Sequence, residues 1–374
     1  MVKIGIVFGT RPEAIKMAPV VKQFKTHNKW NTKVIVTGQH REMLDQVLDV
    51  FNIIPDYDLD VMTENQSLTH ITTAVLHGLE QIFSIWKPDY LLVHGDTTTA
   101  LAAALAGYYH KITIAHVEAG LRTGNLHNPF PEEANRKLID GLSTIFFAPT
   151  EAAAKNLRSE GVSSSQIYVT GNTVIDALYM VVDDNYRFKQ SQLQALTFSQ
   201  PVILVTAHRR ENWGQPLANI CAAIREAAAC LPVDIVFAMH KNPQIQSVVK
   251  SYLAGIANVH LIDAPAYVEF ANLLNRCRFL VTDSGGLQEE AAALGKPVLV
   301  LRDMTERPEG IDSGILKLVG TDKDKIVSEI SNLVQDSELY HRMAHSHNPY
   351  GDGKAAMRIK NIITEFHWRD VNGN

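Results

Sequence analysis

The sequence has few cysteines, no long basic run and no apolar stretch long enough to cross a bilayer. Its 374 residues include only Cys221, Cys230 and Cys277, without CxxC spacing, which argues against a disulfide framework and favours reduced thiols in a cytoplasmic protein. The 35 Lys and Arg residues against 40 Asp and Glu residues give a net charge of −5, so nothing indicates nucleic acid or an anionic membrane as a partner. The most apolar predicted helix, Ala100 to Tyr109, is too short for a membrane span, and the first residues enter a strand without a signal-peptide pattern.

Motifs of several common enzyme classes are also missing. The sequence has no GxGxxG fingerprint for a dinucleotide, no GxxxxGK[ST] phosphate loop, no GxSxG nucleophile elbow and no zinc-type Cys/His spacing. His341 and His345 have the i, i+4 spacing of a metal pair and His347 lies nearby, but the pattern is not completed to a metal site. We therefore expect neither a metal nor a nicotinamide cofactor.

The length and the order of elements indicate two domains. At 374 residues the chain exceeds what one hydrophobic core usually organises. Short apolar strands alternate with amphipathic helices, without hairpin turns, which predicts an α/β fold with two doubly wound, Rossmann-like domains facing a central cleft. We place the first domain at 1–172 and the second at 173–360, with a polar linker region from Asp183 to Gln200, and expect a C-terminal helix at 361–374 to pack back on the first domain.

The stretch from Arg278 to Pro297 combines an apolar strand, two glycines and a helix. Asp283 and Ser284 offer helix-cap chemistry, Gly285 and Gly286 let the backbone turn tightly, and Leu287 to Leu294 follows as a helix. A helix start presents unpaired N–H groups and the positive end of the helix dipole, which suits a phosphate or diphosphate. Glu290, one turn into the helix, can then take ribose hydroxyls. A plain strand-to-helix connection would show the same local pattern.

Three acidic residues follow predicted strands or begin a helix in the first half of the chain. Asp96 and Glu118 each follow an apolar strand, at the sheet edge where ligands bind in open α/β folds. Asp96 can equally cap the next helix, whereas no helix starts directly after Glu118. Glu132 lies in the first turn of a helix that Pro131 opens, where an acid also favours the helix dipole.

Cationic side chains follow other strands. Arg11 and Lys16 lie near the start of the first helix and can reach a phosphate or a sugar hydroxyl, although Lys16 alone also fits a solvated surface charge. His208 and the two arginines after it follow a strand of the second half, and Arg307 lies in a later loop. Phosphate-binding groups in one half and carboxylates in the other indicate chemistry on a sugar-like group beside a diphosphate leaving group.

Nine segments, in order and nearly end to end, resemble the non-hydrolysing UDP-N-acetylglucosamine 2-epimerase family. They are FGTRPEAIKMAP (Phe8 to Pro19), TGQHREMLDQV (Thr37 to Val47), VHGDTTTALA (Val93 to Ala102), HVEAGLRTG (His116 to Gly124), PEEANR (Pro131 to Arg136), TGNTVIDAL (Thr170 to Leu178), HRREN (His208 to Asn212), TDSGGLQEEAAALGKPVLVLRDMTERPE (Thr282 to Glu309) and NPYGDGKA (Asn348 to Ala355). The resemblance implies the glycosyltransferase-B architecture and interconversion of UDP-N-acetylglucosamine and UDP-N-acetylmannosamine. It also implies a homodimer in the cytoplasm that supplies N-acetylmannosamine units for cell-surface polysaccharides without a cofactor.

The same resemblance implies roles for individual residues. It puts Arg11, Lys16, Asp96, Glu118, Glu132 and His208 at the reacting sugar and diphosphate, with the three carboxylates and His208 as catalytic residues. It puts Phe270 beside the uracil, Ser284, Gly285 and Gly286 on phosphate, Glu290 on the ribose and Arg307 near the nucleotide or sugar. The family expels UDP to form 2-acetamidoglucal and adds it back after proton transfer at C2, so at least two acid/base groups are needed.

Several bacterial members of the family bind a second UDP-N-acetylglucosamine beside the active site. The matching positions here are Gln39, His40, Arg41, Arg210 and His240, but a later arginine of that site falls at Ala74. We therefore expect a second site that is weak or rebuilt from other cations. Two other functions stay open from the residues: a glycosyltransferase of the same architecture, which needs an acceptor, and an inactive nucleotide-sugar binding protein.

Overall fold

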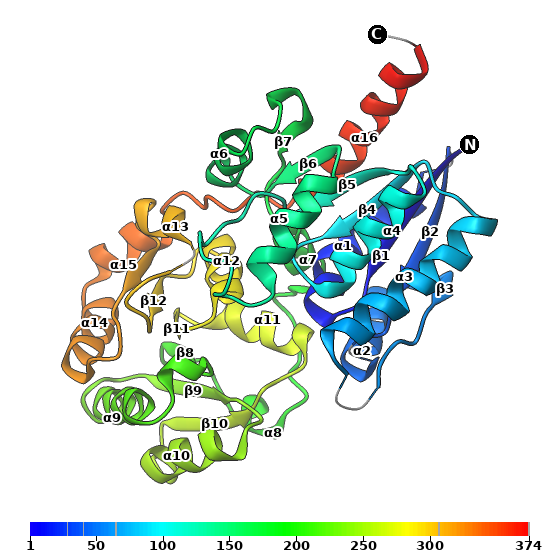
Figure 1. Cartoon of the computed structure of the whole chain (residues 1–374). Coiled ribbons are helices and arrows are strands. Elements are labelled where there is room, and N and C mark those ends of the chain that lie inside the picture. The colour runs from blue at the N-terminus through cyan, green and yellow to red at the C-terminus, as the bar shows by residue number, and fades with distance from the viewer. Residues whose placement is uncertain (28, 40, 64–65, 306, 373–374) are drawn as a thin grey trace. The chain divides into compact units, whose positions relative to one another are not determined.

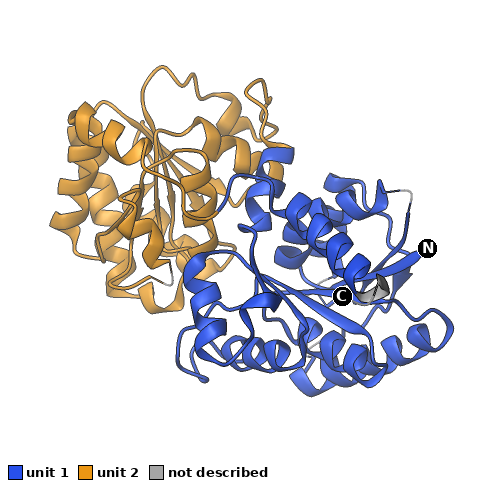
Figure 2. Cartoon of the chain, turned by 90° about the horizontal axis from the view of Figure 1, so that it is seen from above, with its two compact units in different colours: residues 1–180, 351–374 blue, residues 181–350 orange. Residues whose placement is uncertain are grey.

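The computed structural model describes residues 1–27, 29–39, 41–63, 66–305 and 307–372 (Figure 1). The chain forms two compact units (Figure 2): unit 1 comprises residues 1–180 and 351–374, and unit 2 comprises residues 181–350. None of the described helices combines the length and the hydropathy that a membrane span requires.

Unit 1 is built on a parallel sheet with the strand order β3-β2-β1-β4-β5-β6-β7. The strands are β1 (Val2–Phe8), β2 (Trp30–Val36), β3 (Tyr57–Asp58), β4 (Tyr90–His94), β5 (Thr113–Val117), β6 (Ile145–Ala148) and β7 (Ile167–Val169). The helices are α1 (Arg11–Lys25), α2 (Arg41–Phe51), α3 (Leu68–Ile85), α4 (Thr98–Tyr109), α5 (Glu132–Leu142), α6 (Glu151–Ser159), α7 (Thr173–Val181) and α16 (Ala355–Asn372). The sheet reverses its strand order between β1 and β4, which is where open α/β sheets bind ligands.

Unit 2 has the same type of sheet, with the order β10-β9-β8-β11-β12-β13 and parallel pairing throughout. Its strands are β8 (Val202–Thr206), β9 (Asp234–Met239), β10 (Val259–Asp263), β11 (Phe279–Thr282), β12 (Val298–Val300) and β13 (Leu316–Leu318). Its helices are α8 (Ser191–Gln194), α9 (Gln215–Cys230), α10 (Pro243–Leu253), α11 (Tyr267–Arg276), α12 (Gly285–Ala293), α13 (Pro308–Asp312), α14 (Lys323–Gln335) and α15 (Ser337–Ala344). The predicted pair of doubly wound, parallel-sheet units is thus confirmed.

The central strands are apolar because helices cover them. Every residue of β4 is buried, and Leu91 and Val93 pack in one core with α3 and α4. Alanines fill much of α4, so this helix packs closely on β1, β4 and β5. Such strands appear in the sequence as continuous apolar runs, which is why they were predictable. The edge strands β3, β7 and β13 were not predicted, because they are only two or three residues long.

The boundaries between the units differ from those expected. The chain enters unit 2 after Met180, so nearly all of α7 belongs to unit 1. It returns to unit 1 at Gly351, before α16, and the boundary expected between residues 360 and 361 would divide that helix. The Asp176 carboxylate of α7 accepts the N–H groups of Ala355 (3.1 Å) and Ala356 (2.9 Å), which fixes the start of α16, and α16 packs against α1.

Candidate active site

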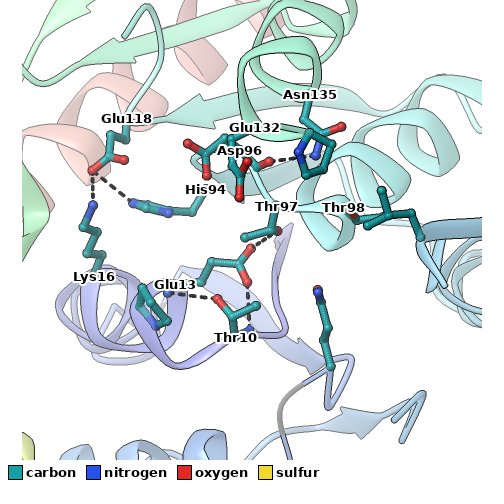
Figure 3. Close-up of a pocket in the computed structure, with 14 residues that line it drawn as sticks. Thr10, Glu13, Lys16, His94, Asp96, Thr97, Thr98, Glu118, Glu132 and Asn135 are labelled. Atoms are coloured by element: carbon teal, nitrogen blue, oxygen red, sulfur yellow. Dashed lines mark hydrogen bonds and ion pairs between the residues drawn. The ribbon is translucent and has the colours of Figure 1, made fainter. Parts of the chain in front are cut away.

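Unit 1 contains a cavity of about 350 Å³ at the ends of its central strands (Figure 3). Of the residues predicted from the sequence, five line this cavity: Lys16, Gln39, Asp96, Glu118 and Glu132. Arg11, the first residue of α1, is not among the lining residues. The structure therefore brings the three carboxylates and one cation together, as expected from parallel strands that end at one sheet edge.

Glu118 is the most enclosed of the three carboxylates. It is 6% exposed and adopts a φ of +66°, a left-handed conformation that is uncommon for a residue other than glycine. Its Oε2 contacts the Lys16 ammonium and accepts a hydrogen bond from the Asn172 amide at 3.0 Å, while its carbonyl accepts one from Arg136 at 2.8 Å. These partners hold an unfavourable backbone conformation in place, which is typical of functional sites.

The charge of Glu118 follows from the same partners. Burial alone would raise its pKa, but Lys16 and Arg136 outweigh burial and hold the pKa well below its usual range. Glu118 is therefore an anion at neutral pH. It is paired with Lys16, which excludes the interpretation of Lys16 as a solvated surface charge.

His94, the last residue of β4, lies beside Glu118 (Figure 3) and was not predicted as a site residue. Its Nε2 lies 3.8 Å from Glu118 Oε2, and neither ring nitrogen forms a hydrogen bond within the described part of the chain. Burial lowers the pKa of His94 to about 3, so the ring is neutral at pH 7. Its single sequence signal is its position at a strand end. A neutral imidazole with two unused nitrogens gives the cavity both a donor and an acceptor.

Asp96 does not cap α4. The N-cap is Thr97, whose hydroxyl accepts the Ala100 N–H at 3.0 Å, so the Asp96 carboxylate is left for other contacts. Asp96 Oδ2 contacts the Arg136 guanidinium, and the Asp96 carbonyl accepts a hydrogen bond from Asn135 at 2.8 Å. Of the two interpretations of Asp96, the structure thus favours a cavity residue.

Glu132 begins α5 and lines the cavity with its side chain. Its Oε2 is buried and accepts no hydrogen bond from the described residues. The next residue, Glu133, has a different task, since it is buried and accepts the N–H groups of Thr123 (2.9 Å) and Gly124 (3.1 Å). Glu132 therefore combines the favourable position at a helix start with a carboxylate oxygen that the described residues leave without a hydrogen bond.

Glu13 adds a fourth carboxylate to the cavity wall. Like His94, it was not predicted from the sequence as a site residue. Its Oε2 accepts the N–H groups of Gly9 and Thr10, and its Oε1 accepts the Thr97 hydroxyl at 2.7 Å (Figure 3). Thr10 and Glu13 form a capping box, a pattern that is visible in the sequence as Thr-x-x-Glu. Burial raises the pKa of Glu13. Its contacts tie the loop after β1 to the loop that carries Asp96.

Unit 2 holds the predicted phosphate-binding residues at the start of α12. Ser284 is the N-cap and makes no side-chain cap hydrogen bond. Gly285 and Gly286 are helical residues without positive φ, so the expectation that they allow a tight turn was wrong. Because they have no side chains, the two glycines leave the backbone at the helix start uncovered. The space beside Gly286 is open, since a Cβ there would meet no atom within 4 Å. This start offers backbone N–H groups and a positive dipole end to an anion.

The other predicted residues of unit 2 lie on several elements. His208 follows β8, and its ring stacks on that of His240 at a centroid distance of 6.1 Å and an interplanar angle of 10°. Arg307 contacts Glu289, while Glu290 is buried in α12 and Phe270 lies half-buried in α11. Arg210 is exposed in a short 3₁₀ turn over Arg210–Asn212.

The predicted second-site residues of unit 1 are only partly described. His40 lies outside the described residues. Arg41 contacts the carboxylates of Asp45 and Asp58, and Ala74 packs against the core of unit 1 from α3. An anion would therefore have to compete with two carboxylates for Arg41.

No group of three or more His, Cys, Asp or Glu side chains arranged to hold a metal ion occurs among the residues that the structure describes. His341 and His345 lie on and just after α15, with ring centroids 5.6 Å apart. His345 Nδ1 lies 2.8 Å from the His341 carbonyl. This contact is local to the helix end.

Comparison with known proteins gives one consistent result. The family model for UDP-N-acetylglucosamine 2-epimerase matches residues 22–364. The UDP-N-acetylglucosamine 2-epimerases of Campylobacter jejuni and Escherichia coli K12 are each 50% identical to this chain, over 96% of it and 97% of their own length. The crystal structure of the Neisseria meningitidis enzyme bound to UDP-GlcNAc matches with a TM-score of 0.88 and 48% identity, covering 97% of this chain and 100% of that one. The Methanocaldococcus jannaschii enzyme in complex with UDP-GlcNAc and UDP matches with a TM-score of 0.78 and 34% identity, covering 97% and 99%. The chain belongs to the UDP-N-acetylglucosamine 2-epimerase family.

Proposed function

We propose that this protein catalyses the reversible epimerisation of UDP-N-acetylglucosamine at C2, giving UDP-N-acetylmannosamine. The observation that carries the proposal is the cavity of unit 1, where Asp96, Glu118 and Glu132 lie together beside Lys16. Membership of the family supports it, as do the related structures that contain UDP-GlcNAc or UDP. Acid/base groups in such a cavity suit proton transfer to and from carbon.

The chemical difficulty of the reaction explains why several carboxylates are needed. The C2 hydrogen is barely acidic, because C2 is not next to a carbonyl group. Breaking the C1–O bond solves this: UDP leaves with the bonding electron pair, a carboxylate takes the C2 proton, and 2-acetamidoglucal forms with a C1–C2 double bond. A proton then returns to C2 from the opposite face, and a UDP oxygen adds to C1. The two faces of C2 require two proton-transfer groups.

The carboxylates of the cavity differ in their surroundings. Glu118 is anionic because Lys16 and Arg136 lower its pKa, and a carboxylate must be ionised before it can accept a proton. Asp96 is held through Arg136, and Glu132 keeps one oxygen without a hydrogen bond among the described residues. We assign these three carboxylates to proton transfer and to stabilisation of the positive charge that develops at C1.

Residues of unit 2 would hold the nucleotide. The bare start of α12, with Ser284 as N-cap, and the guanidinium of Arg307 suit the diphosphate. We assign the ribose to Glu290, the uracil to Phe270 and the departing diphosphate to His208. These groups stabilise a leaving group by charge and hydrogen bonding, and the proposed reaction needs no net oxidation or reduction.

We extend the proposal to the cellular setting that the family resemblance implies. The protein would act in the cytoplasm as a homodimer and supply N-acetylmannosamine units for cell-surface polysaccharides. Apolar side chains at the C-terminal ends of α3 and α4, two helices that pack against each other, suit such an assembly: Ile85, Tyr108 and Tyr109 are 79%, 58% and 66% exposed. Light scattering of the purified protein tests the dimer directly.

Incubation of the protein with UDP-N-acetylglucosamine alone tests the proposed activity. We expect ¹H NMR of the anomeric protons to show growth of UDP-N-acetylmannosamine to a constant ratio that is also reached from the other side. A double variant, Asp96→Asn with Glu132→Gln, serves as the control. If a product forms only after a sugar or lipid acceptor is added, the protein is a transferase and the proposal fails.

A further inference from the structure

Asp283, between β11 and α12, holds the segment that carries His208. The sequence suggests a helix cap for Asp283, but the N-cap of α12 is Ser284. The Asp283 side chain is fully buried, and its Oδ2 accepts three hydrogen bonds, from the N–H groups of His208 (2.9 Å) and Arg209 (2.8 Å) and from the Asn212 amide (2.9 Å). All three donors belong to the segment after β8, so Asp283 serves that segment instead of its own helix.

The second carboxylate oxygen of Asp283 faces the His208 ring. Oδ1 is buried and lies 3.1 Å from His208 Nδ1, a charge contact, and it accepts no hydrogen bond among the described residues. Burial alone would raise the pKa of Asp283, but His208, the Arg209 N–H and the Asn212 amide hold it below its usual value. A carboxylate oxygen this close to Nδ1 attracts an N–H group and repels a ring lone pair, so the favoured neutral form of His208 carries its proton on Nδ1.

The strands that precede His208 and Asp283 fix the separation of these two residues. β8 and β11 are neighbours in the sheet, with Thr206 opposite Thr282, and the hydroxyls of these two threonines lie 2.6 Å apart. His208 follows one strand end and Asp283 the other. On its far side, the His208 ring stacks on His240, whose pKa is lowered by burial and by repulsion from His208. A neutral His240 against one ring face and Asp283 at Nδ1 restrict the orientation of His208.

We propose that Asp283 is the positioning residue of the reaction: it orients His208 and keeps the proton on Nδ1, so that Nε2 is the nitrogen that acts on the substrate's diphosphate. The inference rests on the proposed function for the role of Nε2, but not for the tautomer. When His208 is protonated, Nε2–H donates a hydrogen bond to the departing diphosphate, and Asp283 stabilises the imidazolium charge. The same division of tasks between a buried carboxylate and a histidine serves hydrolytic triads.

The variant Asp283→Asn tests the assignment with little change of shape. Its amide oxygen can still accept the three hydrogen bonds at Oδ2, but its NH₂ group then faces His208 Nδ1. The change moves the proton of the neutral ring to Nε2 and removes the negative charge that stabilises the imidazolium. We expect kcat to fall by roughly 10²-fold or more, with a small change in KM and in thermal stability. Asp263→Asn, at the end of the edge strand β10 of the same sheet, is the matched control and should keep the wild-type rate. A kcat of Asp283→Asn within about threefold of wild type would refute the proposal.

The tautomer can also be read in the wild-type protein, without any functional assumption. In ¹⁵N-histidine-labelled protein at about pH 8.5, two-bond ¹H–¹⁵N spectra distinguish the two neutral tautomers, and His208→Gln identifies the His208 signals among the 15 histidines. We expect Nδ1–H in the wild type and Nε2–H in Asp283→Asn. A wild-type Nε2–H tautomer would overturn the role of Asp283 while leaving the proposed epimerisation intact. The expected tautomer in a protein that does not epimerise would instead sink the proposed function alone.

Discussion

Replacing Glu118 by Gln is expected to destabilise unit 1 strongly. The new amide side chain keeps the size of the original and can still bond Asn172, but it removes the negative charge. Lys16, which is 16% exposed, and Arg136, which is 9% exposed, then face each other in a buried site without that counter-charge. The Glu118 carboxylate thus stabilises the two buried cations, just as they stabilise its negative charge.

The expected size of the effect follows from the burial of the pair. Breaking a buried ion pair by removing one partner costs about 3–5 kcal/mol, because the remaining charge stays desolvated. Exposed pairs contribute about 0–1 kcal/mol. The matched control is Glu151→Gln in the same unit, since Glu151 pairs with Arg158 but is 72% exposed. The two Glu→Gln changes should therefore differ by roughly 2–5 kcal/mol.

Urea titration of each variant gives the free energy of unfolding of unit 1. The pH dependence adds a check, because the folded-state pKa of Glu118 lies below its ordinary value of 4.5. A depressed pKa contributes stability that is present above the unfolded value and is lost as the pH falls through the folded value. The difference in the free energy of unfolding between wild type and Glu118→Gln should therefore be largest at pH 7 and decrease in acid below about pH 4.5. Equal stabilities of Glu118→Gln and Glu151→Gln at pH 7 would refute the buried ion pair.

Three further predictions concern activity and binding. Asp96→Asn and Glu132→Gln should each lower kcat by about 10²-fold or more while calorimetry shows UDP binding retained; a loss of UDP affinity with near-normal kcat would instead make that residue a ligand-holder. Ser284→Ala and Arg307→Ala should weaken UDP binding first, and an unchanged Kd in both would exclude α12 as the phosphate site. Ala74 stands where the family resemblance implies an arginine of the second site, so we expect a weak second site and initial rates from pure UDP-N-acetylmannosamine that depend little on added UDP-N-acetylglucosamine. A strict requirement for micromolar amounts of that sugar would show a functional second site.

Much of the fold was predictable because the buried strands are continuous apolar runs and the helices are amphipathic. The place of Glu118 in the cavity wall was also predictable, since no helix cap explains an acid at that strand end. Asp96 stayed ambiguous until the structure showed that Thr97 caps α4. The sequence contains both possible caps side by side, and only the backbone geometry decides between them.

Other features depend on contacts between distant segments. Asn172 reaches Glu118 across 54 residues, and Asp283 accepts hydrogen bonds from His208 across 75 residues. Local patterns carry no information on such pairs, so Asp283 was interpreted as a cap. His94 shows the same limit, because a histidine at the end of a buried strand becomes notable only once Lys16 and Glu118 are known to surround it.

The origin of the hydrogen at C2 decides whether epimerisation proceeds by elimination. Incubation of the protein with UDP-N-acetylglucosamine in D₂O, followed by mass spectrometry and ¹H NMR, measures deuterium at C2 of both epimers and any released UDP and 2-acetamidoglucal. We expect one deuterium at C2 in each product molecule, because a carboxylate of the cavity exchanges its proton with solvent before it returns one to carbon. Epimerisation with no solvent label at C2 would contradict proton transfer by Asp96, Glu118 and Glu132, and with it the proposed mechanism.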